Sequence, residues 1–111
     1  MKLKVCGLSN KITIETCINN DVDFCGFILN FPKSHRYIKY DKAEKLFNID
    51  KKNTKFVGVL VEPSQEELEK FSNLNLDYFQ LYGQYDSKSL INIKNKFKKK
   101  IITTIQVKNK N

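Results

Sequence analysis

Short apolar runs alternate with segments of helical periodicity along the whole chain. The apolar runs predict five strands, at residues 2–6, 23–29, 56–61, 78–81 and 101–105. Between them, apolar residues recur every three to four positions and predict four helices, over residues 11–19, about 42–49, a segment that opens at 63–67, and about 87–97. The second and third strands are almost continuously apolar, as expected of strands buried on both faces.

Local signals support these elements. Asn10, Asp41 and Ser64 each precede a helical segment and can cap it, and Ser64 with Glu67 three residues later forms a capping box. In the first strand, alternation predicts that Leu3 and Val5 face the core while Lys4 and Cys6 share the opposite face.

The order of the predicted elements indicates an α/β fold. Strands spaced about 20 to 25 residues apart and separated by helices imply a parallel sheet with right-handed crossovers. A (β/α)8 TIM barrel continues this rhythm to about 250 residues. We therefore expect residues 1–111 to form a single domain that contains the first four to five βα units of such a barrel.

Composition and charge bear mainly on the partners of the protein. The chain is 41% hydrophobic and carries a net charge of +8 from nineteen lysines and one arginine. A basic nucleic-acid-binding module is one interpretation of this charge. The lysines are scattered, however, apart from residues 94–100, which we expect on the solvent side and at the end of the last helix. We therefore expect no nucleic-acid partner.

The compartment follows from what the N-terminus and the cysteines predict. The chain has no window of 18 apolar residues, and it opens on a strand pattern rather than a signal peptide, so we expect a cytoplasmic protein without a membrane partner. The three cysteines, Cys6, Cys17 and Cys25, form no CxxC pair and no metal-type spacing with His35. We expect free thiols and no metal, with Cys17 and Cys25 as small buried hydrophobes.

Three residues are candidates for chemistry. Cys6 ends a strand and precedes Gly7, which leaves room for a ligand; the alternative is a small buried hydrophobe. Arg36 is the single arginine and offers a planar fork for a carboxylate or phosphate; the alternative is an ordinary surface cation. Gln80 lies near a strand end and can hydrogen-bond a ligand or simply meet water.

Four stretches together resemble one enzyme family. They are KVCGLS at 4–9, GFILNFPKSHRYI at 26–38, FVGVLVEPS at 56–64 and LDYFQLYG at 76–83. In order and spacing they are similar to phosphoribosylanthranilate isomerase, a (β/α)8-barrel enzyme of tryptophan biosynthesis. The first two stretches carry most of the specificity. The resemblance spans essentially the whole chain.

The resemblance implies an aldose–ketose isomerase without metal or cofactor. Its substrate would be N-(5-phosphoribosyl)anthranilate, rearranged in an Amadori reaction to 1-(2-carboxyphenylamino)-1-deoxyribulose 5-phosphate. Cys6 would be the general base and Arg36 would bind the anthranilate carboxylate. Gln80 is expected to bind substrate.

The chain departs from this family at named positions. Tyr82 stands where the family usually has histidine, and Thr103 and Thr104 stand where it tends to have a lysine. The resemblance also assigns the general acid to an aspartate on a sixth strand and the phosphate site to later loops, beyond residue 111. We therefore expect weak activity from the isolated chain and self-association through unpaired strand edges. The alternative function is a non-catalytic half-barrel that assembles with itself or a partner chain.

Overall fold

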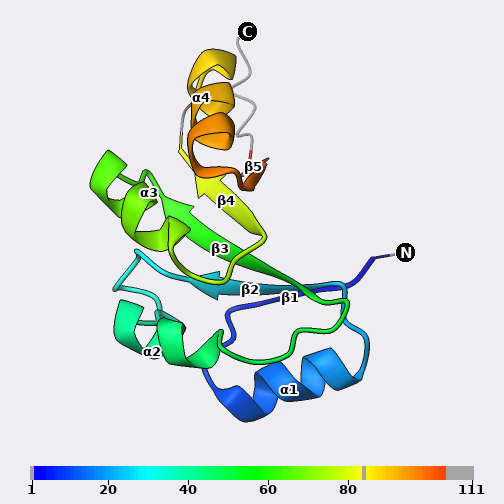
Figure 1. Ribbon diagram of the computed structural model, residues 1–111. Helices are drawn as coiled ribbons and strands as arrows, with labels where there is room; N and C mark the ends of the chain where they lie inside the picture. The colour runs from blue at the N-terminus through cyan, green and yellow to red at the C-terminus, as the bar shows by residue number, and fades with distance from the viewer. Residues whose placement is uncertain (1, 84, 105–111) are drawn as a thin grey trace, which may run out of the picture.

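Five strands alternate with four helices, in the order predicted from the sequence. The computed structural model describes residues 2–83 and 85–104. The elements are β1 (Lys4–Cys6), α1 (Lys11–Asn19), β2 (Phe24–Ile28), α2 (Tyr40–Leu46), β3 (Lys55–Val61), α3 (Gln65–Ser72), β4 (Tyr78–Tyr82), α4 (Ser87–Phe97) and β5 (Lys100–Thr104) (Figure 1). Residue 105, the expected end of the last strand, lies outside the described residues.

All five strands belong to one parallel sheet. Their spatial order is the chain order, β1-β2-β3-β4-β5, so each helix connects two neighbouring strands. The helices follow one another around one side of the twisted sheet, from α1 near β1 and β2 to α4 near β5 (Figure 1). Consecutive parallel strands with their helices on one side form a segment of the wall of an α/β barrel, as the sequence predicted.

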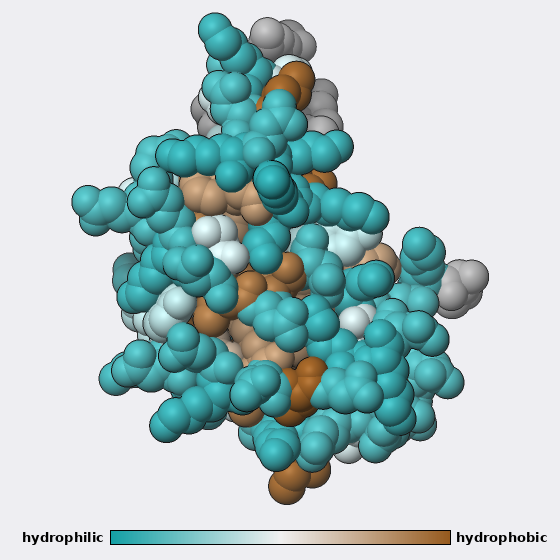
Figure 2. All heavy atoms as spheres, in the orientation of Figure 1, coloured by the Kyte–Doolittle hydropathy of each residue, from teal (hydrophilic) through white to brown (hydrophobic). Residues whose placement is uncertain are grey.

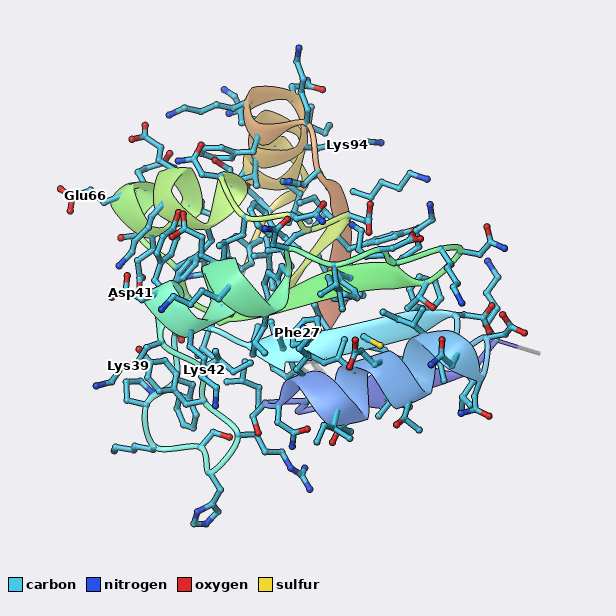
Figure 3. The ribbon with its side chains drawn as sticks, turned by 60° about the horizontal axis from the view of Figure 1, so that its bottom comes forward. Phe27, Lys39, Asp41, Lys42, Glu66 and Lys94 are labelled. Atoms are coloured by element: carbon cyan, nitrogen blue, oxygen red, sulfur yellow. The ribbon has the colours of Figure 1, made fainter. Side chains whose placement is uncertain are left out.

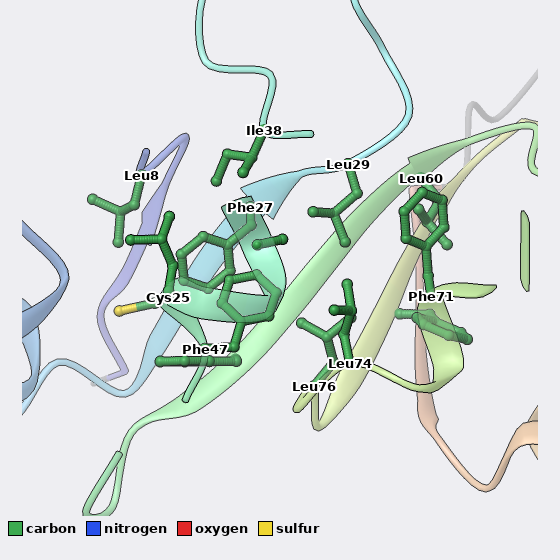
Figure 4. Close-up of a cluster of buried hydrophobic side chains, with 14 of the residues drawn as sticks. Leu8, Cys25, Phe27, Leu29, Ile38, Phe47, Leu60, Phe71, Leu74 and Leu76 are labelled. Atoms are coloured by element: carbon green, nitrogen blue, oxygen red, sulfur yellow. The ribbon is translucent and has the colours of Figure 1, made fainter. Parts of the chain in front are cut away.

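The main core lies between the sheet and the helices. Three phenylalanines from β2, β3 and the end of α2 form its centre. The ring centroids of Phe27 and Phe47 are 4.4 Å apart (Figure 4), and those of Phe27 and Phe56 are 5.0 Å apart. Cys17 and Cys25 are buried in the same core, which confirms their interpretation as small hydrophobes. Burial, with the neighbouring Cys17 thiol, raises the pKa of Cys25 to about 12.

The opposite face of the sheet is the side that becomes the interior of a barrel. Side chains alternate along a strand, so a residue next to a core position points to the other face, and residues two apart share a face. Register pairs Cys6 with Gly26 and Gly26 with Val57, and it pairs Val59 with Gln80. These residues therefore lie on one face, which we call the interior face.

Two aspartates hold the amino ends of the strands in place. The Asp23 carboxylate accepts a hydrogen bond from the Leu3 N–H at 2.7 Å, and the Asp77 carboxylate accepts one from the Phe56 N–H at 2.9 Å. Lys51 forms an ion pair with Asp77 at 2.9 Å. Burial alone would raise the pKa of Asp77, but the Phe56 N–H and the Lys51 ammonium outweigh it and lower that pKa. Both aspartates lie in segments that lead from a helix into a strand.

The helix caps are confirmed at two of the three predicted positions. Asn10 accepts a hydrogen bond from the Thr13 N–H at 2.8 Å, and Ser64 with Glu67 forms the capping box. Asp41, in contrast, is not a cap. Helix α2 starts at Tyr40, two residues earlier than predicted, and Lys39 occupies the cap without a side-chain bond. Asp41 lies in the first turn, where its charge still suits the helix dipole.

Two further expectations are corrected. Leu3 does not face the core: β1 begins only at Lys4, and Leu3 remains 57% exposed at the end of the sheet. Lys99 does not belong to the solvent side of the last helix, because its ammonium turns back and donates to the Leu76 carbonyl at 2.8 Å. Burial and the nearby Lys51 charge lower the pKa of Lys99 against the opposing effect of Asp77.

Charged side chains cover the outer surface. Asp41 and Lys42 on α2, Glu66 on α3 and Lys94 on α4 project away from the helices (Figure 3). Hydrophilic residues dominate the visible face, with apolar side chains showing between them (Figure 2). Within residues 2–83 and 85–104, no helix is both long and apolar enough to cross a membrane.

Candidate active site at the carboxyl ends of the strands

The candidate residues gather at one edge of the sheet. Because the strands are parallel, their carboxyl ends meet at the same edge, and this is the edge where α/β barrels carry their active sites. Cys6 is the last residue of β1, and Arg36 lies in the loop after β2. Tyr82 is the last residue of β4, and Gln80 lies two residues before it, in the middle of that strand. The fold thus brings together residues that are up to 76 positions apart.

Cys6 is exposed, whereas Cys17 and Cys25 are buried. Its thiol lies over Gly26 on the neighbouring strand: the sulfur is 3.2 Å from the point where a Cβ on Gly26 would be. A side chain at that position would displace the thiol, so Gly26 makes the space that Cys6 occupies. The alternative interpretation of Cys6, as a buried hydrophobe, is wrong.

Gly7 places Arg36 beside Cys6. The backbone of Gly7 has a φ of +77°, a conformation that favours glycine. Its N–H and that of Leu8 both donate to the Gly26 carbonyl, at 3.0 and 3.3 Å. The stem of Arg36 passes through the space that a Cβ on Gly7 would fill. The room expected over Gly7 therefore accommodates Arg36, and its guanidinium belongs to the same edge as the thiol.

The loop that carries Arg36 is tied to the sheet on both sides. The Ile38 N–H donates to the Ile28 carbonyl at 2.9 Å, and the Arg36 N–H donates to the Ser34 hydroxyl at 3.1 Å. At the start of the loop, the Asn30 amide exchanges two hydrogen bonds with the backbone of Val61, at 2.6 and 2.9 Å. Asn30 was missed in the sequence, because nothing local indicates a partner 31 residues away. Arg36 itself is exposed.

Gln80 is buried on the interior face, so it does not simply meet water at a strand end. Its side-chain oxygen accepts a hydrogen bond from the Lys4 ammonium, and its amide nitrogen donates to the Tyr82 hydroxyl at 3.4 Å. Lys4 was not selected as a candidate from the sequence. The available signal was its position two residues before Cys6, which places both side chains on one face.

The other residues singled out in the sequence have plainer roles. His35 is exposed in the loop after β2, and Tyr82 is 40% exposed at the end of β4. Gly58 marks close packing, because a Cβ there would lie 2.7 Å from the Leu76 side chain. Thr103 is half-buried on β5. Among residues 2–83 and 85–104, no group of three or more His, Cys, Asp or Glu side chains is placed to hold a metal ion.

The arrangement combines a nucleophilic or basic thiol with two kinds of cation. The exposed thiol of Cys6 can accept a proton when ionised, the guanidinium of Arg36 can bind a carboxylate with two hydrogen bonds, and the ammonium of Lys4 lies on the same face. Such a set suits proton abstraction from a small anionic substrate.

Comparison with known proteins identifies the family. Residues 3–110 match the pattern of the family described as N-(5'phosphoribosyl)anthranilate (PRA) isomerase. The N-(5'-phosphoribosyl)anthranilate isomerase of Streptococcus mutans is 32% identical over 108 residues, which are 96% of this chain and 53% of that protein. The corresponding protein of Listeria monocytogenes is 35% identical over 109 residues, which are 97% of this chain and 51% of its own length.

A solved structure gives the same result in three dimensions. It is a phosphoribosyl anthranilate isomerase in complex with reduced 1-(o-carboxyphenylamino)-1-deoxyribulose 5-phosphate. The two folds superpose with a TM-score of 0.76 at 26% identity, over 93% of this chain and 52% of that one. The five parallel strands and their helices thus match about half of a barrel of this family, and the chain spans about half the length of the curated relatives it matches. The chain therefore belongs to the N-(5'-phosphoribosyl)anthranilate isomerase family.

Proposed function

We propose that this chain, as one half-barrel domain, supplies the base and the carboxylate-binding residue of a phosphoribosylanthranilate isomerase. The observation that carries the proposal is the placement of Arg36 over Gly7, the residue that follows the exposed Cys6. A base and an anion-binding fork at the carboxyl edge of a barrel wall are what an Amadori rearrangement of an anthranilate ribosyl phosphate requires. In this role the protein acts in tryptophan biosynthesis.

The chemistry follows from the two side chains. Arg36 binds the anthranilate carboxylate and so fixes the orientation of the ribosyl chain. After ring opening to the Schiff base, the Cys6 thiolate takes the proton from C2 of the ribosyl chain. The C–H electron pair forms the C1–C2 double bond, and the π pair of the protonated imine moves onto its nitrogen, which gives the neutral enol-amine. A proton then adds to C1 and the C2 hydroxyl loses its proton, which gives the ketone. Ring opening needs an acid, which the family resemblance assigns to an aspartate on a sixth strand.

The test is an activity measurement with a complementing half. The whole chain is mixed with the separately produced C-terminal half of the Streptococcus mutans relative, and the loss of substrate fluorescence is followed. We expect activity that falls about 10²–10⁴-fold in Cys6→Ala. Lys94→Gln, an exposed substitution on α4, serves as the matched control and keeps full activity. Equal activity of Cys6→Ala and the unmodified chain would exclude Cys6 as the base.

A second candidate function is assembly of half-barrels without catalysis. Among the described residues, β1 and β5 each pair with one neighbouring strand only, so each leaves one backbone edge open. Open edges of parallel sheets recruit further strands. Light scattering after size-exclusion chromatography separates the cases: a discrete dimer favours assembly, whereas a monomer opposes it.

A further inference from the structure

Lys4 reaches from its own position on β1 to the level of Cys6. Its register partner is Phe24, but its side chain extends along the interior face, and its Cε lies 3.5 Å from the Cβ position of Gly26. The Cys6 sulfur lies 3.2 Å from the same point. The lysine stem and the thiol therefore both lie next to the same point above Gly26.

The charge of Lys4 is not neutralised by a carboxylate in the described part of the chain. The ion pairs recorded there join Lys51 to Asp77 and Lys96 to Glu69. The recorded acceptor of the Lys4 ammonium is the neutral amide oxygen of Gln80. An ammonium has three hydrogen-bond donors, and a half-buried cation without a counter-charge favours a ligand that brings negative charge or oxygen acceptors.

We propose that Lys4 is a second substrate-binding residue, and this inference rests on the function proposed above. Its ammonium donates a hydrogen bond to the oxygen on C2 of the ribosyl chain, the carbon from which Cys6 takes the proton. The contact of both side chains with the Gly26 site is the basis, since a carbon facing the thiol holds its oxygen within reach of the lysine. This oxygen is a hydroxyl in the substrate and a carbonyl in the product, and either can accept the bond.

Gln80 then acts through Lys4 rather than on the substrate. Its oxygen holds the ammonium, and the Tyr82 hydroxyl accepts from its nitrogen at 3.4 Å, which fixes the amide in turn. Gln80 is thus a positioning residue, and Tyr82, which stands in place of the histidine usual in the family, supports it.

Two ligands separate the contributions of Arg36 and Lys4. Anthranilate carries only the carboxylate, whereas reduced 1-(o-carboxyphenylamino)-1-deoxyribulose 5-phosphate also carries the hydroxyl chain. Calorimetric titration of the whole chain measures both affinities. We expect Lys4→Met to weaken binding of the reduced analogue by about tenfold or more and to leave anthranilate unchanged, because one charged hydrogen bond is lost. Arg36→Leu weakens both ligands.

Controls keep the outcome decisive. Lys55→Met removes an exposed lysine from the amino end of β3, on the interior face of the sheet. We expect this variant to bind both ligands normally. Gln80→Glu retains Lys4 and the fold of the protein, but it gives the lysine a carboxylate partner. This variant should therefore weaken binding of the reduced analogue as Lys4→Met does. Unchanged affinity for the reduced analogue in Lys4→Met or Gln80→Glu would overturn this inference and leave the proposed function standing. Failure of the unmodified chain to bind either ligand would overturn the proposed function and the inference with it.

Discussion

Substitution of Gly7 by alanine perturbs the centre of the candidate site without removing any of its functional groups. The added Cβ meets two obstacles: a backbone φ of +77°, and the stem of Arg36, which already fills that space. The first obstacle is a property of the loop, whereas the second exists only because Arg36 lies over Gly7. The two costs can therefore be measured separately.

The magnitudes follow from these two terms. Left-handed backbone costs a non-glycine residue about 1–2 kcal/mol. Displacement of the Arg36 stem adds about 0.5–1 kcal/mol, since the arginine is exposed and can move at the expense of its packing. We expect Gly7→Ala to lower the free energy of unfolding by about 1.5–3 kcal/mol in total. In an Arg36→Ala background the cost should fall to the backbone term of about 1–2 kcal/mol.

Urea unfolding of the four chains of this double-mutant cycle is the assay. A coupling energy of about 0.5 kcal/mol or more between the two positions would support the contact. Gly7→Ala should also weaken anthranilate binding, because it displaces the guanidinium. Strict additivity of the two substitutions, with unchanged anthranilate affinity, would refute the placement of Arg36 beside Cys6.

Further predictions concern the thiols, the ion pair and the packing of the sheet. In the native protein at pH 8, iodoacetamide should label Cys6 alone, because the other two thiols are buried and react only in urea. Cys6→Ser should therefore abolish labelling of the native protein, and labelling that persists in this variant would contradict the prediction. Asp77→Asn should destabilise the fold by about 1–2 kcal/mol at pH 7, because it removes the charge that Lys51 and a buried N–H stabilise. Since the native pKa of Asp77 is lowered, this difference is present above about pH 4 and lost as the pH falls through the native pKa; a difference that persists at lower pH would argue against the ion pair. Gly58→Ala should cost about 1–3 kcal/mol in unfolding experiments, because its Cβ would lie 2.7 Å from Leu76, and a neutral effect would show that the packing there is looser.

Features encoded in a few consecutive residues could be predicted from the sequence. Asn10 and Ser64 cap their helices as expected, because a cap needs only a side chain and an N–H two or three residues later. Asp41 was the exception, since α2 begins at Tyr40 with a cap that uses no side chain. Leu3 was misplaced because alternation cannot show where a strand begins relative to the helices that cover it.

The site depended on contacts between distant segments. The pairing of Lys4 with Gln80 joins residues 76 positions apart, and no local pattern encodes it. Cys6 and Arg36 were each ambiguous alone, and only the family resemblance connected them. The parallel sheet explains why: it brings the ends of β1 and β2 together, so that one glycine accommodates the arginine stem.

Protection of Cys6 by a bound ligand tests the central claim most directly. The claim is that Arg36 holds the substrate with its reacting carbon over the thiol. The alkylation rate of Cys6 is measured in the whole chain with and without saturating reduced 1-(o-carboxyphenylamino)-1-deoxyribulose 5-phosphate, with binding verified by calorimetry. The account predicts that the ligand slows alkylation by about tenfold or more and that Arg36→Leu loses this protection. An unchanged rate in the presence of bound ligand would contradict it.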